Sequence, residues 1–521
     1  METIYVQRRT MKAVWEMPLV QKFIRCVLYS RAAVISVLHA LFCRMCAIRE
    51  PGLAMTFVPY SEKGRAYIGK QRMLHEFFKA RQRVPAYVKL PMPMFKSLST
   101  TVAIKLLPVL DKNHFAKSNT IESCCIHGFI PKGSVIDESS GSSGAPMQWV
   151  RGKREREYNQ RLIRFSLKRL IPGNRQIIIN AFALGPWATG MNISSAFEKH
   201  AVLKSLGPDA SKIIQAIKHF GTAYSYIIMG YPPFLKNLTD RSDIRWSEYN
   251  VSFIYGGESM SEYLREYMQR KCIRKVYGSY GASDLELNIA AENDFTIEIR
   301  KLLMTNKLLA NKLLMDTNIL PMVFQYNPAD FYIEQNSNNE LLFTLCRPGY
   351  VVPKIRYNIY DKGHTLRLKD LKRIMRSCGI DTSEFQWPKI DLPLLFLYGR
   401  SDASVSYYGC KICPQHVQDC IMMSKTLRDQ INNFCMHTRE NNVGDKQLEF
   451  YMELKSHGMP DILKTQDLAA LFLLNLEQIN QDFRESMAIA GRDNIPLVHF
   501  FPAGHHQFRS LDFKVKYQYI I

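Results

Sequence analysis

The chain has 521 residues, of which 46% are hydrophobic and 22% charged, and its formal net charge is +22. This length excludes a single small domain, and the composition is that of a globular protein with a large core rather than a disordered chain. The excess of cations favours anionic partners such as nucleotides, coenzyme A or anionic lipid. The sequence contains no helix-turn-helix, zinc-finger or RNA-binding signature, so we expect no nucleic-acid partner.

Residues 1–80 are predicted to form a mostly helical N-terminal arm. Within it, Arg31 and Arg44 bracket an apolar run that is shorter than the roughly 20 residues of a membrane-spanning helix. The run starts too late for a cleavable signal sequence and lacks a small-residue cleavage site. The first interpretation is a helix packed within the protein. The alternative is a helix that lies on a membrane surface, with contact through residues 27–48.

The twelve cysteines are scattered along the chain, which favours a reduced, cytoplasmic protein over a disulfide framework. Location at the periphery of a membrane is the alternative that the N-terminal run leaves open. Cys43/Cys46 and Cys410/Cys413 have C-x-x-C spacing. Zinc would require both pairs to converge, or histidines to join them, so structural zinc is not expected.

The middle of the chain alternates strands and helices. QIIINAF (176–182) and SYIIMG (225–230) are typical of buried strands, and residues 200–221 are predicted to be helical between them. This alternation predicts a mainly parallel sheet. Between residues 320 and 360, short strands with turn residues at 336–339 predict a β-rich subdomain with a hairpin.

Three domains are expected: the helical arm, a large domain over residues 81–400, and a small C-terminal domain over 401–521. The segment ESSGSSGAP (138–146) lies in the large domain after a short apolar stretch. Alone, such a segment is typical of a surface loop. The alternative is an anion cradle, in which backbone amides and serine hydroxyls surround a phosphate. It is not a Walker loop, because no Gly-Lys-Ser/Thr closes it.

Four further stretches follow in order. They are YGGESMSEYLREYM (255–268), VYGSYGASDLE (276–286), PKIRYNIYDKG (353–363) and YGRSDASVSYYGCKICPQHV (398–417). Together with ESSGSSGAP, they resemble the adenylate-forming superfamily of acyl-CoA synthetases, with the closest likeness to its phenylacetate–CoA ligase branch. The resemblance covers roughly residues 80–420.

The resemblance implies an α/β fold with mixed and parallel sheets in a large adenylate-forming domain, followed by a small mobile α+β domain. It implies an acid–thiol ligase that activates a small-molecule carboxylic acid with ATP and Mg²⁺ through an acyl-adenylate. The acyl group then passes to a thiol, with coenzyme A as the expected acceptor. The alternatives are an amine or carrier-protein acceptor, or a non-catalytic nucleotide-binding interaction protein.

The resemblance also implies which residues bind the nucleotide. They are Ser139, Ser140, Gly141, Ser142, Ser143 and Gly144 for the β- and γ-phosphates, Gly256, Gly257 and Glu258 for the adenine pocket, Tyr280 and Gly281 beside the adenine, Asp361 for the ribose, and Arg400. Ala145 stands where the family's loop has a lysine, and Arg151, Lys153 or Arg154 are candidates to supply that charge.

The expected catalytic residues are Ser283, Asp284 and Lys514. Ser283 would contact the α-phosphate. Asp284 stands where the family has a Mg²⁺-binding glutamate, with Glu286 as a second candidate. Lys514, or Lys516 in its place, would bridge the anionic carboxylate and phosphate oxygens during adenylation.

Asp402 is the expected hinge between the large and small domains. The acyl pocket is expected to include Phe182, Trp187 and Gly190, within a segment rich in small and aromatic residues. An aryl or medium-chain acid is the expected substrate.

Overall fold

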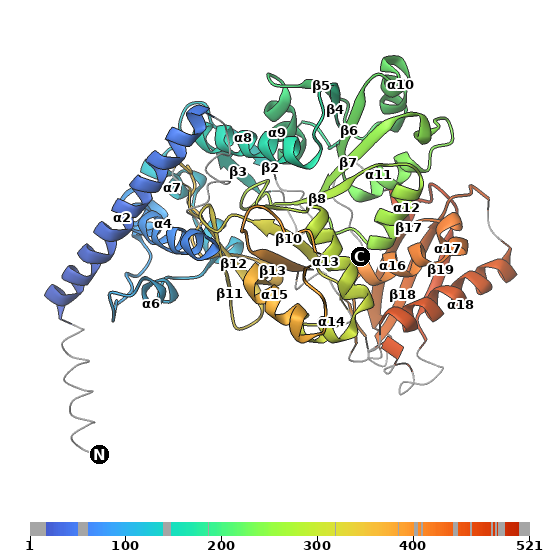
Figure 1. Ribbon diagram of the computed structural model, residues 1–521. Coiled ribbons are helices and arrows are strands. Elements are labelled where there is room, and N and C mark those ends of the chain that lie inside the picture. The colour runs from blue at the N-terminus through green and yellow to red at the C-terminus, as the bar shows by residue number, and fades with distance from the viewer. Residues whose placement is uncertain are drawn as a thin grey trace.

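The computed structural model describes most of the chain. The described residues are 17–49, 61–138, 147–185, 187–317, 319–347, 349–383, 385–400, 405–407, 410–440, 446–458, 461–480, 483–484, 487 and 495–509. They form a large part built around one extensive sheet and a smaller C-terminal part with a sheet of its own (Figure 1).

Two long helices form the N-terminal region, α2 (Pro18–Arg49) and α4 (Glu62–Arg83), and they pack on one another. Helix α4 begins where the Ser61 hydroxyl accepts a hydrogen bond from the Gly64 amide. It is joined to the large part by a buried ion pair between Arg72 and Asp330, 3.2 Å long. Helix α4 therefore runs through the predicted boundary at residue 80 and belongs to the packing of the large part.

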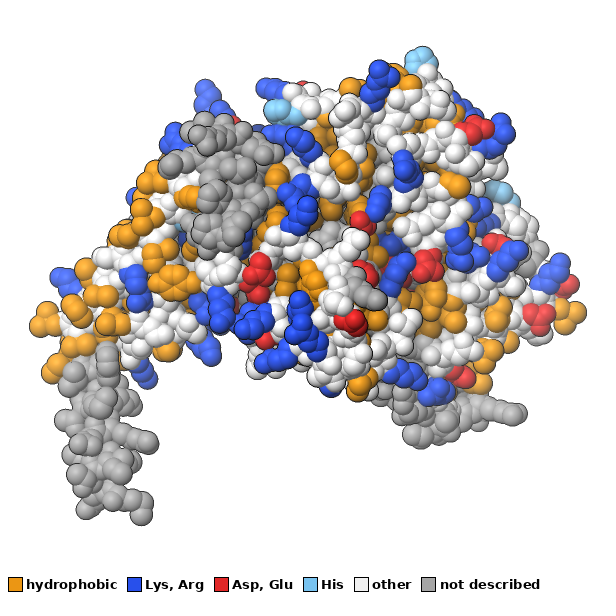
Figure 2. Space-filling model, viewed as in Figure 1, with side chains coloured by type: hydrophobic (Ala, Val, Ile, Leu, Met, Phe, Trp, Pro, Cys, Tyr) orange, Lys and Arg blue, Asp and Glu red, His pale blue; other side chains and the backbone are white. Residues whose placement is uncertain are grey.

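Helix α2 exposes apolar side chains along its outer length (Figure 2). The exposed residues are Leu19, Phe23, Val34, Val37, Leu38 and Leu41. By length and composition alone, Pro18–Arg44 could cross a membrane, because the helix extends well before the apolar run that the sequence brackets. Its inner face packs in the core through Ile24, Leu28 and Ala32.

Short elements connect α4 to the main sheet. They are α5 (Pro85–Val88), α6 (Thr100–Lys105), β1 (Leu110–Asp111), the π-helix η1 (Lys112–Ala116), α7 (Ile121–Cys124), the 3-10 helix η2 (Ile126–Gly128), the antiparallel hairpin β2 (Val135–Glu138) and β3 (Gln148–Arg151), and α8 (Lys153–Leu170).

The main sheet has 12 strands, in the order β11-β12-β13-β14-β10-β9-β8-β7-β6-β4-β5, with β1 alongside β13. Its parallel half contains β4 (Gln176–Asn180), β5 (Val202–Ser205), β6 (Ser225–Gly230), β7 (Asn250–Gly256) and β8 (Val276–Tyr280). The connecting helices are α9 (Ala188–Phe197), α10 (Ala210–Phe220), α11 (Pro232–Thr239) with the 3-10 helix η3 (Trp246–Glu248), and α12 (Glu262–Arg270).

The strands predicted near 176 and 225 are confirmed as β4 and β6. The prediction of helix over 200–221 is wrong at its start, since residues 202–205 form the edge strand β5. Gly207 adopts a positive φ of 67° and is followed by Pro208, which separates this strand from helix α10.

The antiparallel half contains β9 (Ala290–Ala291), β10 (Met322–Tyr326), β11 (Phe331–Gln335), β12 (Glu340–Leu345), β13 (Tyr357–Leu366) and β14 (Leu394–Arg400). Helices α13 (Asp294–Thr305), α14 (Lys307–Leu313) and α15 (Leu368–Ser377) accompany it. The predicted hairpin is confirmed: β11 and β12 pair antiparallel around the turn at 336–339 and form an edge of the main sheet.

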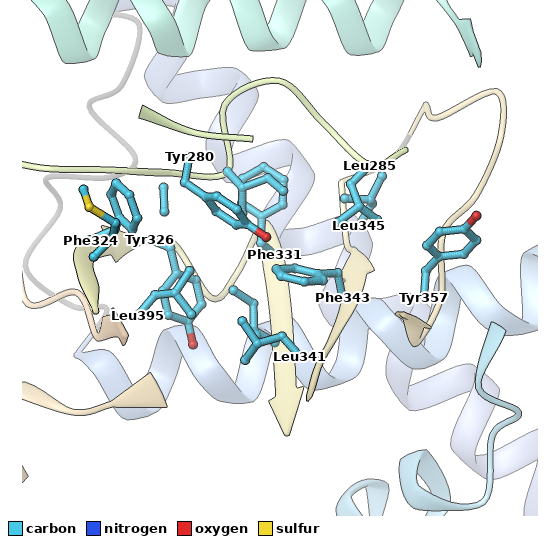
Figure 3. Packing of buried hydrophobic residues seen from close by; sticks show 14 of the residues in the cluster. Tyr280, Leu285, Phe324, Tyr326, Phe331, Leu341, Phe343, Leu345, Tyr357 and Leu395 are labelled. Carbon is cyan, nitrogen blue, oxygen red and sulfur yellow. The ribbon is translucent and has the colours of Figure 1, made fainter. Parts of the chain in front are cut away.

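Aromatic rings pack where the two halves of the sheet meet (Figure 3). The Tyr280 ring stacks against Phe324, with centroids 5.8 Å apart, and lies 6.1 Å from Phe343. Phe343 lies between Tyr280 and Tyr357 in this view. Tyr280 and Tyr357 therefore belong to one continuous core cluster.

The C-terminal part is α+β. It contains β15 (Val405–Tyr407), β16 (Cys410–Ile412), α16 (Pro414–Met423), α17 (Lys425–Gln430), β17 (Ile431–Glu440), β18 (Lys446–Leu454), α18 (Ile462–Ile479), β19 (Leu497–Phe501) and α20 (His506–Arg509). It has its own hydrophobic core, which runs from Val405 to Phe483. Lys455 forms an ion pair with Asp240, 3.3 Å long, and Arg428 lies over the Tyr267 ring, so this part docks beside α11 and α12.

Candidate active site

The candidate site lies at the carboxyl ends of the parallel strands. Residue pairs Asn180–Met229, Gly230–Tyr255 and Gly256–Ser279 align these ends along one edge of the sheet. Ligands of open α/β sheets bind outside this edge, where the chain leaves the strands. The predicted residues after β4, β7 and β8 therefore emerge at the same edge.

Gly256 and Gly257 leave β7 beside two aromatic rings. Gly257 has a φ of 84°, and a Cβ atom there would lie 2.7 Å from the Tyr231 ring, so glycine is required. Phe182 packs edge-on against Tyr231, with ring centroids 4.9 Å apart. Burial, with a further contribution from Glu258, raises the pKa of Tyr231 to about 12. The structure thus brings together Phe182, expected in the acyl pocket, and the residues expected to line the adenine pocket.

Gly190 lies in the first turn of helix α9, and Trp187 immediately precedes this helix. A Cβ atom on Gly190 would lie 2.0 Å from the Ala183 carbonyl oxygen, so its missing side chain allows α9 to pack on the chain after β4. Trp187 precedes α9 and forms an isolated parallel bridge with Glu138, the last residue of β2. The segment expected to line the acyl pocket therefore lies against the hairpin β2–β3.

Tyr280 and Asp361 are in direct contact. The Tyr280 hydroxyl donates to Asp361 Oδ2 over 2.6 Å, and Asp361 is paired with Arg400 between β13 and β14. Burial and the Asp361 carboxylate raise the pKa of Tyr280 well above its usual range. Three residues expected at the nucleotide thus converge from β8, β13 and β14. The side chain of Arg400 lies outside the part of the protein that the structure describes.

The turn that carries Ser283 and Asp284 is joined to hairpin β2–β3 by Arg151. Its guanidinium donates to the carbonyl oxygens of Ser283 and Leu285 and lies 3.4 Å from Asp137. Strand β2 ends at Glu138 and β3 begins at Gln148, so the segment expected to bind phosphate connects strands fixed beside this turn. Arg151 is thereby engaged with the protein, whereas Lys153 and Arg154 are exposed at the start of α8.

The two acidic candidates differ in their surroundings. Glu286 accepts hydrogen bonds from Arg347 over 2.8 Å, Tyr350 over 3.1 Å and Asn159, and it is buried. Asp284 has no hydrogen-bond or ion-pair partner in the described part of the chain. No group of three His, Cys, Asp or Glu side chains among the described residues is placed to hold a metal. A lone carboxylate such as Asp284 still fits Mg²⁺, which is commonly held by one or two carboxylates together with substrate phosphates.

Lys354 is a candidate functional residue that the sequence motifs did not reveal. It is buried, and burial lowers its pKa to about 8 although Asp284 acts in the opposite direction. The only signal in the sequence is a lysine between proline and isoleucine in PKIRY, next to an apolar strand. Arg356, two residues later, instead forms an ion pair with Glu334, 3.0 Å long.

Several expected site residues lie outside the described residues, and their roles stay predictions. They are Ser139, Ser140, Gly141, Ser142, Ser143, Gly144, Asp402, Lys514 and Lys516.

No protein-family model matches the chain, and no curated protein matches its sequence. Among solved structures, it is similar to 2-hydroxyisobutyryl-CoA ligase in the postadenylation state in complex with R3-HIB-AMP. The TM-score is 0.60 at 12% identity, over 88% of this chain and 89% of that chain. The same ligase in the postadenylation state in complex with 2-HIB-AMP gives a TM-score of 0.59 at 12% identity, with the same coverage. The chain therefore shares the fold of this ligase, which confirms the fold class expected from the sequence.

Proposed function

We propose that this protein activates a carboxylic acid with ATP through an acyl-adenylate and transfers the acyl group to the thiol of coenzyme A. The observation that carries the proposal is the convergence of separate motifs at one edge of the sheet. Gly257, Tyr280, Asp284 and Asp361 come from distant stretches of sequence and surround the carboxyl ends of β7 and β8. The shared fold with an acyl-CoA ligase supports the same reaction class.

The residues divide into two roles in this proposal. Phe182 is buried and packs against Tyr231, so Tyr231 and the backbone at Gly256–Gly257 are the proposed contacts for adenine or an apolar acyl group. Asp361 offers carboxylate oxygens, which suit the vicinal hydroxyls of a ribose. An aryl or medium-chain acid is the proposed substrate, and the likeness to the phenylacetate–CoA ligase branch favours an aryl acid.

Adenylation brings a carboxylate to a phosphate, and both are anions. Cations placed in advance reduce this repulsion and stabilise the charge that develops at phosphorus. Lys514 is the proposed bridging cation, and Asp284 would hold Mg²⁺, which neutralises phosphate charge when bound with the nucleotide. Ser283 would donate a hydrogen bond from its hydroxyl to an oxygen of the α-phosphate.

The reaction is tested by acid-dependent exchange of labelled pyrophosphate into ATP across a panel of aryl and medium-chain acids. We expect exchange with at least one acid, trapping of its acyl-adenylate by hydroxylamine, and thioester formation when coenzyme A is added. Exchange without thioester would indicate an amine or carrier-protein acceptor. Absence of exchange across the panel would refute the proposal and favour a non-catalytic nucleotide-binding protein.

The bridging lysine is tested separately. Lys514→Ala should abolish exchange, while Lys516→Ala, which removes the same charge two residues away, should retain it. If Lys514→Ala retains exchange and Lys516→Ala loses it, Lys516 rather than Lys514 is the bridging lysine.

We also propose that the outer face of α2 contacts an anionic membrane surface. Its exposed apolar residues form a stripe, and residues 17–49 contain five Lys or Arg (Lys22, Arg25, Arg31, Arg44 and Arg49) with no Asp or Glu. A cationic helix with an exposed apolar stripe matches a lipid surface in both charge and polarity. This contact would place the ligase at the periphery of a membrane.

A further inference from the structure

Lys354 is a buried cation whose ammonium contacts aromatic rings but no hydrogen-bond acceptor or carboxylate among the described residues. It is 3% exposed, and its ammonium nitrogen lies 4.0 Å from the centroid of the Trp149 ring and 4.3 Å from that of Tyr357. No ion pair or hydrogen bond to its ammonium is present among the described residues. Cation–π contacts offset part of the cost of burying this charge but supply no hydrogen-bond acceptor. A buried cation without an acceptor suits an anion that arrives with a ligand.

Two further donors at this position are also unsatisfied. The indole nitrogen of Trp149 and the hydroxyl of Tyr357 are buried, and neither has a hydrogen-bond partner within the described part of the structure. Buried polar atoms of proteins are nearly always hydrogen-bonded, so unpaired atoms require an explanation. The Trp149 indole nitrogen and the Tyr357 hydroxyl belong to rings that both lie against the Lys354 ammonium. An indole N–H and an ammonium can only donate hydrogen bonds. Donors without acceptors suit an anionic ligand.

The cluster lies beside the groups expected to meet the phosphates of ATP. Trp149 pairs with Asp137 in hairpin β2–β3, one position inside the Glu138–Gln148 pair that ends the strands. After burial, the Asp284 carboxylate has the largest effect on the pKa of both Lys354 and Tyr357, and it raises both. This carboxylate would hold Mg²⁺ on the same phosphates in the proposed function.

We propose that Lys354, Trp149 and Tyr357 form a binding site for the β- and γ-phosphate oxygens of the nucleotide. Lys354 supplies the cation that Ala145 cannot. The identity of the ligand rests on the proposed function, but the chemistry of the site can be tested with inorganic pyrophosphate alone. Lys153 and Arg154 are exposed to solvent, and Arg151 is occupied by the 283–285 turn, so Lys354 is the cation best placed for this role.

The test is calorimetric titration of the full chain with inorganic pyrophosphate and, separately, with AMP. Lys354→Met should weaken pyrophosphate binding about 10- to 100-fold, as expected for a charged hydrogen bond, and leave AMP binding unchanged. Tyr357→Phe keeps the ring and should weaken pyrophosphate binding about 2- to 10-fold. Lys218→Met removes an exposed lysine on α10 and is the matched control, with unchanged binding of both ligands.

Several results would overturn the inference. One is that the wild-type protein does not bind pyrophosphate. Another is that Lys354→Met and Lys218→Met bind it with equal affinity. The third is that Lys153→Met loses pyrophosphate affinity while Lys354→Met keeps it. Thermal unfolding of each variant identifies loss through misfolding, and Tyr357→Phe decides the question if Lys354→Met does not fold. If Lys354 is needed only for packing, Lys354→Met should lower the stability of the protein. Tyr357→Phe should then bind pyrophosphate with the affinity of the wild type.

The exchange assay separates this inference from the proposed function. If pyrophosphate binds through Lys354 but no acid supports exchange, the anion site stands and the ligase activity is refuted. If exchange occurs and Lys354→Met binds pyrophosphate normally, the ligase activity stands and the anion site is refuted.

Discussion

Replacing Glu262 by glutamine would remove one charge from a buried network of charged side chains that contacts strands β7 and β8. Glu262 contacts Arg265 at 2.9 Å and Arg300 at 2.5 Å, and Arg265 also contacts Glu292 at 2.8 Å. All four side chains are 0% exposed. Tyr255 of β7 completes the network by donating to Glu292 over 2.9 Å.

The magnitude follows from the charge balance. Two arginines and two glutamates sum to zero, so Glu262→Gln leaves one uncompensated positive charge in the core. Breaking a buried ion pair by removing one partner costs about 3–5 kcal/mol. This is a large part of the 5–15 kcal/mol that typically separates folded from unfolded states.

The chain offers a matched control one helical turn away. Glu266 on α12 forms an ion pair with Lys301 on α13, 3.6 Å long, with side chains 46% and 43% exposed. Glu262 and Arg300 join the same two helices. Glu266→Gln should therefore cost at most about 1 kcal/mol, as for other surface pairs.

The assay is urea unfolding of the full chain, followed by far-UV circular dichroism at pH 7 and again at low pH. Burial alone would raise the pKa of Glu262, but Arg265 and Arg300 lower it below its ordinary value. Its stabilisation is thus present above the unfolded-state pKa of about 4.3 and is lost as the pH falls through the lower folded-state pKa. The two variants should differ by at least about 2 kcal/mol at pH 7, and this difference should shrink in acid. Equal free energies of unfolding at pH 7 would refute the reasoning.

Three further predictions follow from other parts of the molecule. Gly190→Ala places a Cβ atom 2.0 Å from a carbonyl oxygen and should lower the free energy of unfolding in urea by about 3 kcal/mol. Gly185→Ala, with a φ of 89° in open space, should lower it by about 1–2 kcal/mol. Similar losses would contradict the packing described for α9. Lys354 has a pKa of about 8 and is charged below this pH. The ratio of the pyrophosphate affinities of wild type and Lys354→Met should therefore fall as the pH rises above about 8. A constant affinity ratio in calorimetry from pH 7 to 9.5 would contradict this. Leu38→Glu on α2 should reduce co-sedimentation with anionic vesicles several-fold, whereas Leu474→Glu on α18 should not; equal binding of both variants would exclude the α2 face.

The elements that could be read from the sequence were those with strong local signals. Strands β4 and β6 are continuous apolar runs, and the β11–β12 hairpin is marked by Asn and Ser at its turn. Strand β5 carries Lys204 and Ser205 and is only partly buried, so its strand state depends on pairing with β4. That pairing is a long-range contact, which local propensity does not contain.

The candidate site divides in the same way. Gly257, Tyr280, Asp284 and Asp361 were expected at one site because they lie in ordered, spaced motifs, and their roles stay predictions. The cluster around Lys354 could not be predicted, since Trp149 lies about 200 residues before it and the cluster exists only where β3 meets the start of β13. A buried lysine is also indistinguishable in sequence from a solvated one.

The continuous pairing of strands in the main sheet limits which parts of the protein could move in the proposed reaction. From β5 to β11 every strand is hydrogen-bonded to its neighbours, and β14 pairs with β13 as far as Arg400, with a register shift between Lys362 and Gly363. If the C-terminal part rotates in the proposed reaction, the chain must turn beyond Arg400 and contacts such as the Lys455–Asp240 pair must be released. In the proposed reaction, an inhibitor that contacted the large part alone would meet the same residues in both half-reactions, and only contacts with the C-terminal part could make it selective for one of them.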